Sequence, residues 1–117
     1  MKPIVPRPIT DAEAAVISEA LNVASVRGVE SPSRSSLSTL SVVCRCECGC
    51  ASVGFVPNEA ELAIGATRIA DAEGTTADGR YIGVLVWGTP STVTSLELYN
   101  GPENEAVLPA AGTLRPF

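Results

Sequence analysis

The sequence contains no histidine, and aromatic residues make up only 4% of its 117 positions. Without histidine the chain cannot form the Ser-His or Cys-His pairs of the usual hydrolases, and it lacks the commonest transition-metal ligand. No G-x-G-x-x-G or Walker A loop is present for binding nucleotides. Two acidic pairs, Asp71 with Glu73 and Glu103 with Glu105, stand in loop-like segments, where solvated charges are the simpler interpretation. We therefore predict that the protein is not an enzyme.

Positive charge and long apolar runs are also scarce. The chain has 8 Lys and Arg residues and 13 Asp and Glu residues, which gives a net charge of -5. The basic residues are scattered from Lys2 to Arg115. Such a surface cannot neutralise phosphates or anionic lipid. No segment approaches the ~20 apolar residues of a membrane span, and prolines and acidic side chains occupy the region where a signal peptide needs an apolar run. We expect no nucleic acid and no membrane as partners, and a cytoplasmic location.

The chain is long enough for one hydrophobic core, which predicts a single domain over residues 1–117. Prolines at three of the first eight positions predict an extended arm over residues 1–9. Thr10 and Glu13 have the spacing of a capping box, and apolar residues then recur at helical spacing. This pattern predicts an amphipathic helix over residues 10–25.

Residues 37–100 have a strand-like pattern of β-branched and small apolar residues. Within this region, residues 61–76 are predicted to form a strand that bends near Gly65, and the Asp78-Gly79 dipeptide predicts a tight turn. The proline-rich residues 101–117 are expected to be an irregular tail. The predicted fold class is α+β, with one N-terminal amphipathic helix packed on an antiparallel β-sheet of roughly four to six strands.

All the cysteines of the chain stand at alternate positions in the stretch "CRCECGC", from Cys44 to Cys50. On a straight strand, neighbouring cysteines would be about 6.6 Å apart. That spacing is too wide for a disulfide, and it prevents the four thiols from sharing one zinc ion at about 2.3 Å from each sulfur. Thiols on a straight strand would therefore be packing residues.

A reversal of the chain at Gly49 would give a different result. Cys46, Cys48 and Cys50 would then converge, and together with a carboxylate, a water or a partner's thiol they could hold a soft metal. Gly49 is the turn-permissive residue that interrupts two strand-like runs, which favours a bend there, with Cys44 pointing into the core from the preceding strand. Inert thiols, a metal site and redox chemistry all remain open.

Three short motifs are spread over most of the chain. Their residues are Arg7, Pro8 and Thr10; Cys46, Cys48, Gly49, Cys50 and Ser52; and Leu96, Glu97, Leu98 and Tyr99. With these motifs the sequence resembles a group of small bacterial proteins with no assigned activity, whose pattern is R-P-L-T before an acidic helix, then C-x-C-G-C-x-S, a central strand, and an L-E-L-Y strand before a proline-rich end. The resemblance implies a shared fold and groups Cys46, Cys48 and Cys50 as one unit, with Cys44 outside it.

Two function classes follow from these observations. The first is a noncatalytic protein-binding or self-associating module with no cofactor, whose partner is an unknown protein or a second copy of the chain. The alternative is a small zinc-binding protein that uses Cys46, Cys48 and Cys50 as ligands, with Cys44 as a further candidate.

Overall fold

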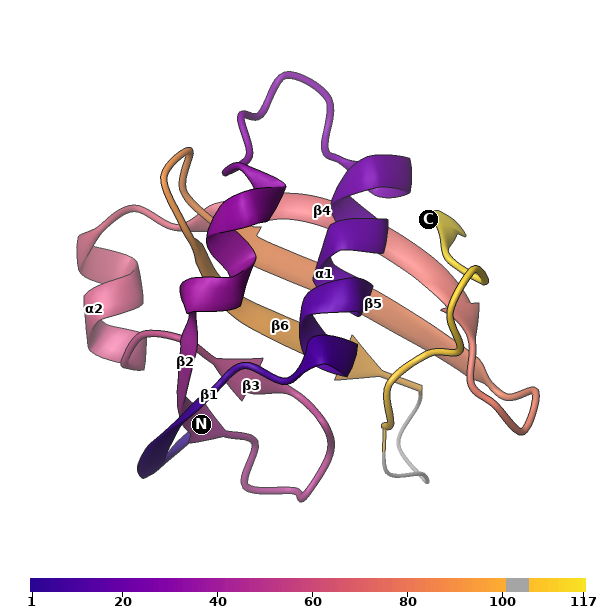
Figure 1. Ribbon diagram of the computed structural model, residues 1–117, viewed down its shortest axis with the longest axis horizontal. Coiled ribbons are helices and arrows are strands. Elements are labelled where there is room, and N and C mark those ends of the chain that lie inside the picture. The colour runs from indigo at the N-terminus through magenta and orange to yellow at the C-terminus, as the bar shows by residue number, and fades with distance from the viewer. Residues whose placement is uncertain (101–105) are drawn as a thin grey trace.

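A computed structural model describes residues 1–100 and 106–117. These residues form an antiparallel sheet of seven strands in the order β1-β2-β3-β6-β5-β4-β7, with helix α1 lying across one face (Figure 1). The α+β class is therefore confirmed, although the sheet is larger than the roughly four to six strands expected. None of the helices in these two ranges is long and apolar enough to cross a membrane. The helices are α1 (Asp11–Ala24), the short 3-10 helix η1 (Arg34–Thr39) and α2 (Asn58–Ala63), and the strands are β1 (Lys2–Pro8), β2 (Ser41–Arg45), β3 (Val53–Gly54), β4 (Thr67–Thr75), β5 (Tyr81–Gly88), β6 (Val93–Tyr99) and β7 (Arg115–Pro116).

Helix α1 begins with the predicted capping box. The Thr10 hydroxyl accepts a hydrogen bond from the Glu13 amide at 3.1 Å, and the Glu13 carboxylate accepts one from the Thr10 amide at 2.9 Å. The same carboxylate accepts two hydrogen bonds from the Arg7 guanidinium, at 3.0 and 2.9 Å. Burial alone would raise the pKa of Glu13, but the bonds from Arg7 and Thr10 outweigh it and hold the pKa below its ordinary value. Glu13 thus joins the end of β1 to the first turn of α1.

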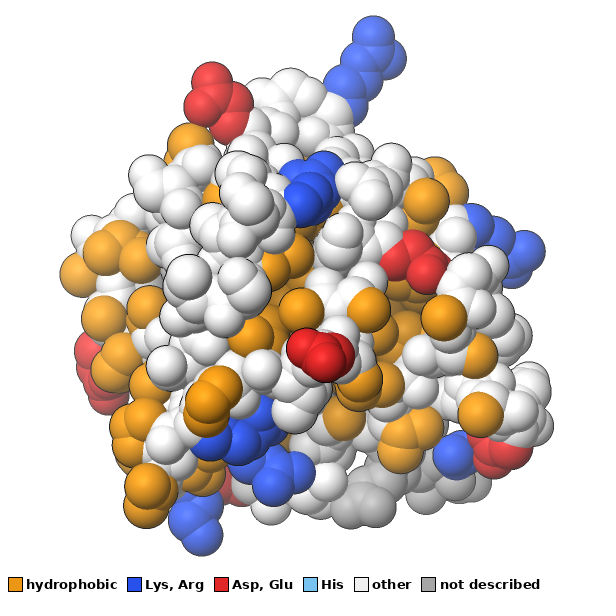
Figure 2. All heavy atoms as spheres, in the orientation of Figure 1, with side chains coloured by type: hydrophobic (Ala, Val, Ile, Leu, Met, Phe, Trp, Pro, Cys, Tyr) orange, Lys and Arg blue, Asp and Glu red, His pale blue; other side chains and the backbone are white. Residues whose placement is uncertain are grey.

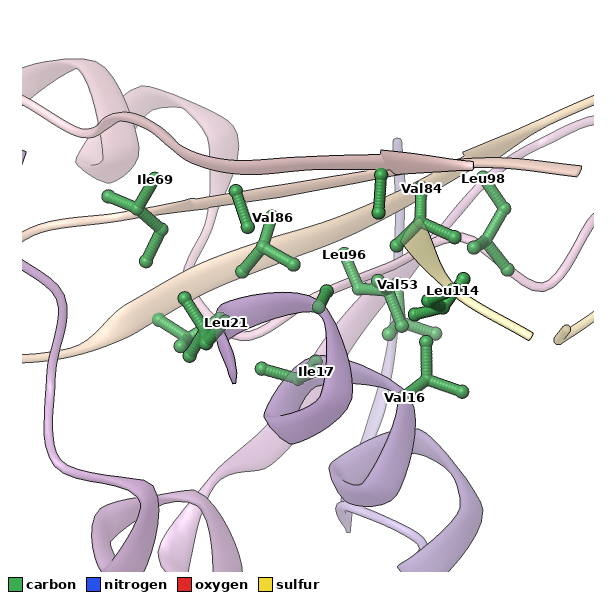
Figure 3. Close-up of a cluster of buried hydrophobic side chains, with 14 of the residues drawn as sticks. Val16, Ile17, Leu21, Val53, Ile69, Val84, Val86, Leu96, Leu98 and Leu114 are labelled. Carbon is green, nitrogen blue, oxygen red and sulfur yellow. The ribbon is translucent and has the colours of Figure 1, made fainter. Parts of the chain in front are cut away.

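The hydrophobic core lies between α1 and the sheet (Figure 3). Ile17 and Leu21 of α1 are almost completely buried, as the helical spacing predicted. Side chains from the central strands meet them, so the helix is held by packing against the sheet. The core strand residues include Val42, Val53, Ile69, Ala72, Ile82, Val84, Val86, Val93, Leu96 and Leu98.

The predicted arm over residues 1–9 is in fact an edge strand. β1 pairs with β2, with Pro3 opposite Cys44 and Arg7 opposite Val42, and the register shifts between these two pairs. A proline has no N–H to donate, so it is tolerated on an edge strand, where one side has no neighbour. The prolines correctly excluded a helix, but they did not exclude pairing with β2.

The strand predicted over residues 61–76 begins only at Thr67, because residues 58–63 form helix α2. Gly65, at φ 72°, separates the two elements. Glu61 of α2 accepts hydrogen bonds from the hydroxyls of Thr94 at 2.7 Å and Ser95 at 3.0 Å, both on β6. These contacts with a distant strand hold a helix where the local alternation had indicated a strand.

The predicted irregular tail contains the edge strand β7, which pairs with β4. Glu19 of α1 anchors this segment by accepting hydrogen bonds from the amides of Gly112 at 2.7 Å and Leu114 at 2.9 Å. Hydrophobic side chains are visible at the surface between α1 and the C-terminal segment (Figure 2). At the other end of the predicted sheet region, residues 34–39 are helical and β2 starts only at Ser41. The predicted acidic pair Glu103 and Glu105 lies outside the described residues.

Candidate metal centre

The cysteine-rich stretch leaves β2, turns, and returns as β3. The turn is closed by a hydrogen bond from the Gly49 amide to the Cys46 carbonyl at 3.3 Å, and the Cys46 amide donates to the Ser52 carbonyl at 3.2 Å. Gly49 has φ 86°, a left-handed conformation that glycine adopts at little cost. The predicted bend at Gly49 is therefore present, and the four cysteines do not share one strand face.

The bend brings three of the four thiols together. The sulfur atoms of Cys46, Cys48 and Cys50 all lie within 4.8 Å of one another. Cys46 and Cys48 are the tightest pair, with 2.7 Å between their sulfurs. A tetrahedral zinc site needs sulfurs about 4 Å apart, and this value lies between the 2.7 Å of the Cys46–Cys48 pair and the 4.8 Å limit of the cluster. The arrangement that the sequence offered as an alternative to a straight strand is the one found.

Cys50 is the buried member of this cluster and is tied to the central sheet. Its sulfur lies 3.3 Å from the Ser52 hydroxyl. That hydroxyl accepts a hydrogen bond from the Leu98 amide of β6 at 2.8 Å and lies 3.3 Å from the Leu98 carbonyl. The strand β6 therefore fixes the position of Cys50 through Ser52.

Cys46 and Cys48 are more accessible: Cys46 is half-buried and Cys48 is exposed. The Cys48 sulfur accepts a hydrogen bond from the Cys50 amide at 3.4 Å. An incoming ion can therefore reach Cys48 from solvent while Cys50 is already held in place. The cluster combines one fixed sulfur with one that faces solvent.

The Cys46 and Cys50 thiols differ in how readily they lose a proton. The hydrogen bond with Cys48 is the main cause that raises the pKa of Cys46 to about 11. Burial alone would raise the pKa of Cys50, but hydrogen bonds from the side chain and amide of Ser52, and from the other two cysteines, lower it below the ordinary value. Cys50 therefore loses its proton more readily than Cys46, and thiolates are the form that binds metals.

Cys44 lies apart from this cluster. It is buried, as predicted, but it does not pack among the core residues under α1. Its sulfur is 3.8 Å from the Met1 sulfur and 3.6 Å from the Val56 carbonyl, in space that Gly54 leaves open because it has no side chain. Burial is also the largest influence raising the pKa of the Cys44 thiol. Cys44 is therefore a packing residue and is not grouped with the other three as a ligand.

Sequence reasoning gave no role to Ser52. Its sequence signals are its place in the C-x-C-G-C-x-S pattern and its position two residues after Cys50, which in an extended chain directs both side chains to the same face. The partner of Ser52, Leu98, is 46 positions away, so the hydrogen bonds could not be foreseen.

Replacing Ser52 by Ala should lower the free energy of unfolding by about 1–3 kcal/mol, because the buried Leu98 amide loses its hydrogen-bond partner. Urea denaturation of the reduced protein measures this change. Ser38→Ala is the matched control, since Ser38 is exposed and its hydroxyl reaches only the Ser35 carbonyl at 3.4 Å. We expect a change within about 0.5 kcal/mol for the control. Equal midpoints for the two variants would contradict the anchoring role of Ser52.

Within residues 1–100 and 106–117, the three cysteines form a ligand group that includes no carboxylate. A metal ion bound there would have three sulfur ligands from the chain and a fourth position open to water or to an external ligand. Comparison of the chain with protein-family models, with curated proteins and with solved structures finds no match. No family is thus identified for the chain. The pattern that carried the resemblance to small bacterial proteins groups Cys46, Cys48 and Cys50, and the structure does bring these three residues together.

Proposed function

We propose that the protein binds a thiophilic metal ion, with zinc as the first candidate, through Cys46, Cys48 and Cys50. The convergence of their sulfurs within 4.8 Å at the Gly49 bend is the observation that carries this proposal. The Cys46–Cys48 separation of 2.7 Å would have to widen by roughly 1 Å around a zinc ion. The exposed Cys48 side chain is the one that can make that movement, because Cys50 is buried beside Ser52.

The ligand set also determines which ions suit the site. Thiolates favour zinc, copper(I) and other soft ions, whereas magnesium and calcium prefer oxygen ligands. With three chain ligands, zinc would complete its tetrahedron with a water or an external group. Because the chain has no histidine to act as a general base, we assign the ion a structural or regulatory role.

Titration of reduced, metal-free protein with zinc tests the proposal, with a chromophoric chelator as competitor. We expect about one zinc per chain, and a loss of affinity of more than about 100-fold for Cys48→Ser, since even changes outside the ligand shell cost about 10–100-fold. Cys44→Ser is the matched control and should bind zinc like the wild type, because its sulfur contacts Met1 and Val56 instead. Absence of zinc binding, or an equal loss in both variants, would refute the proposed site.

The protein-binding alternative rests on a different part of the molecule. Tyr81 and Tyr99 are exposed, and the Tyr99 ring covers Gly83 on β5. Trp87, also on β5, is half-buried and donates a hydrogen bond to Glu97 at 3.1 Å. Exposed tyrosines and a partly exposed tryptophan are common in protein interfaces.

The edges of the sheet are less suited to self-association. The edge strand β1 carries prolines at three of its seven positions, and the edge strand β7 is only two residues long. Prolines and short edge strands hinder pairing with another chain. Self-association through the tyrosine-bearing face remains a proposal, and sedimentation velocity of the metal-free protein over a range of concentrations would detect it.

A further inference from the structure

The three sulfurs of the cluster are not equivalent. Cys46 is half-buried and Cys48 is exposed, and their sulfurs are 2.7 Å apart. Cys50 is buried and its sulfur is 3.3 Å from the Ser52 hydroxyl. The cluster therefore divides into an accessible pair in close contact and a single anchored thiol.

The turn is what allows the pair to meet. On an extended strand the two residues would be about 6.6 Å apart, which excludes a disulfide. The hydrogen bond from the Gly49 amide to the Cys46 carbonyl closes the chain into a tight turn that contains Cys48. The 2.7 Å between the sulfurs is within 1 Å of the S–S bond length of about 2.05 Å. The two sulfurs are therefore within reach of one another.

We propose that Cys46 and Cys48 are a dithiol that forms a reversible disulfide by exchange with small disulfides such as oxidised glutathione, and that this disulfide and a bound metal exclude one another. The first half of the proposal rests on the sulfur geometry alone. The second half also rests on the proposed metal site, because the disulfide removes two of its three ligands and leaves only Cys50.

The exchange proceeds in two steps, each of which conserves atoms and electrons. The exposed Cys48, as its thiolate, attacks one sulfur of oxidised glutathione, which forms a mixed disulfide and releases one glutathione thiolate. Cys46 then loses its proton to solvent and attacks the Cys48 sulfur, which releases the second glutathione thiolate. The two protein thiols are oxidised by two electrons, and one oxidised glutathione is reduced to two glutathione molecules.

Metal binding and oxidation are linked by mass action. An ion that binds only the dithiol form stabilises that form in proportion to its concentration over its Kd. Free zinc at 1,000 times its Kd should thus lower the equilibrium ratio of disulfide to dithiol by about 1,000-fold. By reciprocity, oxidation should weaken zinc binding, because the disulfide form has lost two of the three ligands.

The experiment equilibrates reduced, metal-free protein with mixtures of oxidised and reduced glutathione. After acid quenching and alkylation, mass spectrometry is expected to find a species that carries two alkyl groups where the fully reduced chain carries four, and peptide mapping should place the bond between Cys46 and Cys48. Cys48→Ser should abolish this species. Cys50→Ser should retain the disulfide. If the hydroxyl of this variant disturbs the packing beside Ser52, Cys50→Ala replaces it in the experiment, and it should also retain the disulfide. Cys44→Ser is the control and should behave like the wild type.

The outcomes separate this proposal from the proposed function. A disulfide that forms in the wild type and in Cys50→Ser, and that zinc suppresses in the wild type alone, supports both halves. Zinc binding without a Cys46–Cys48 disulfide overturns the exchange proposal but leaves the metal site intact. A disulfide that forms equally with and without saturating zinc overturns mutual exclusion. A disulfide that involves Cys50, or that persists in Cys48→Ser, overturns the assignment of the pair.

Discussion

Replacing Leu21 by Ala should lower the free energy of unfolding by about 2–5 kcal/mol. Leu21 is only 2% exposed and lies in the core between α1 and the sheet (Figure 3). The substitution removes buried apolar surface and leaves a cavity that the surrounding strands fill only in part, because a paired sheet cannot collapse onto a missing side chain. Equilibrium unfolding in urea measures the change, provided that the slope with denaturant concentration stays the same.

The matched control for Leu21 is on the same helix. Val23 is 41% exposed, so Val23→Ala removes little buried surface and retains good helix propensity. Its effect should stay within about 0.5 kcal/mol. If both variants shifted the midpoint equally, the loss would come from helix formation in general, and the placement of Leu21 in the core would be wrong.

Helix α1 could be predicted because its signals are local. The capping box needs only Thr10 and Glu13, and the apolar stripe is visible within four turns of sequence. What the sequence did not reveal is the second role of Glu13, which binds Arg7 across the junction with β1. The ion pair depends on how the strand approaches the helix, and no periodicity encodes that approach.

The elements that were missed depend on distant partners. The alternation over residues 61–76 predicts a strand, yet Glu61 meets hydroxyls more than thirty positions away on β6 and residues 58–63 are helical. β1 and β7 are strands only because β2 and β4 offer them free edges. Prolines reduce the strand signal of both segments without preventing pairing at an edge.

The candidate site was predictable to a similar degree. Alternate cysteines with Gly49 between the last two indicated either a strand face or a bend, and the left-handed conformation of Gly49 identifies the bend. The separation of Cys44 from the other three required the structure, because it depends on Gly54 and Met1. The anchoring of Cys50 through Ser52 depends on β6 and was equally hidden.

Removal of zinc with a strong chelator should lower the melting temperature of zinc-loaded protein by roughly 15 °C. Free zinc at 1,000 times its Kd adds about 4 kcal/mol to the free energy of unfolding, and each kcal/mol corresponds to roughly 4 °C for a domain of this size. Calorimetry with and without chelator, under reducing conditions, measures the shift. The metal-free protein should still unfold cooperatively, because the core under α1 includes Cys50 as one packing residue among many and does not depend on an ion.

Variants of the cluster decide whether this shift comes from the proposed ligands. The triple variant with Cys46, Cys48 and Cys50 replaced by Ser should melt at the same temperature with and without chelator, whereas Cys44→Ser should keep the full shift. A chelator effect that survived in the triple variant would place the ion elsewhere. Unchanged melting of the wild type, in protein also shown by elemental analysis to contain no metal, would leave the three thiols as packing residues at a bend. The comparison works because a ligand contributes stability only when its ion is bound, whereas a packing residue contributes the same stability whether or not a chelator is present.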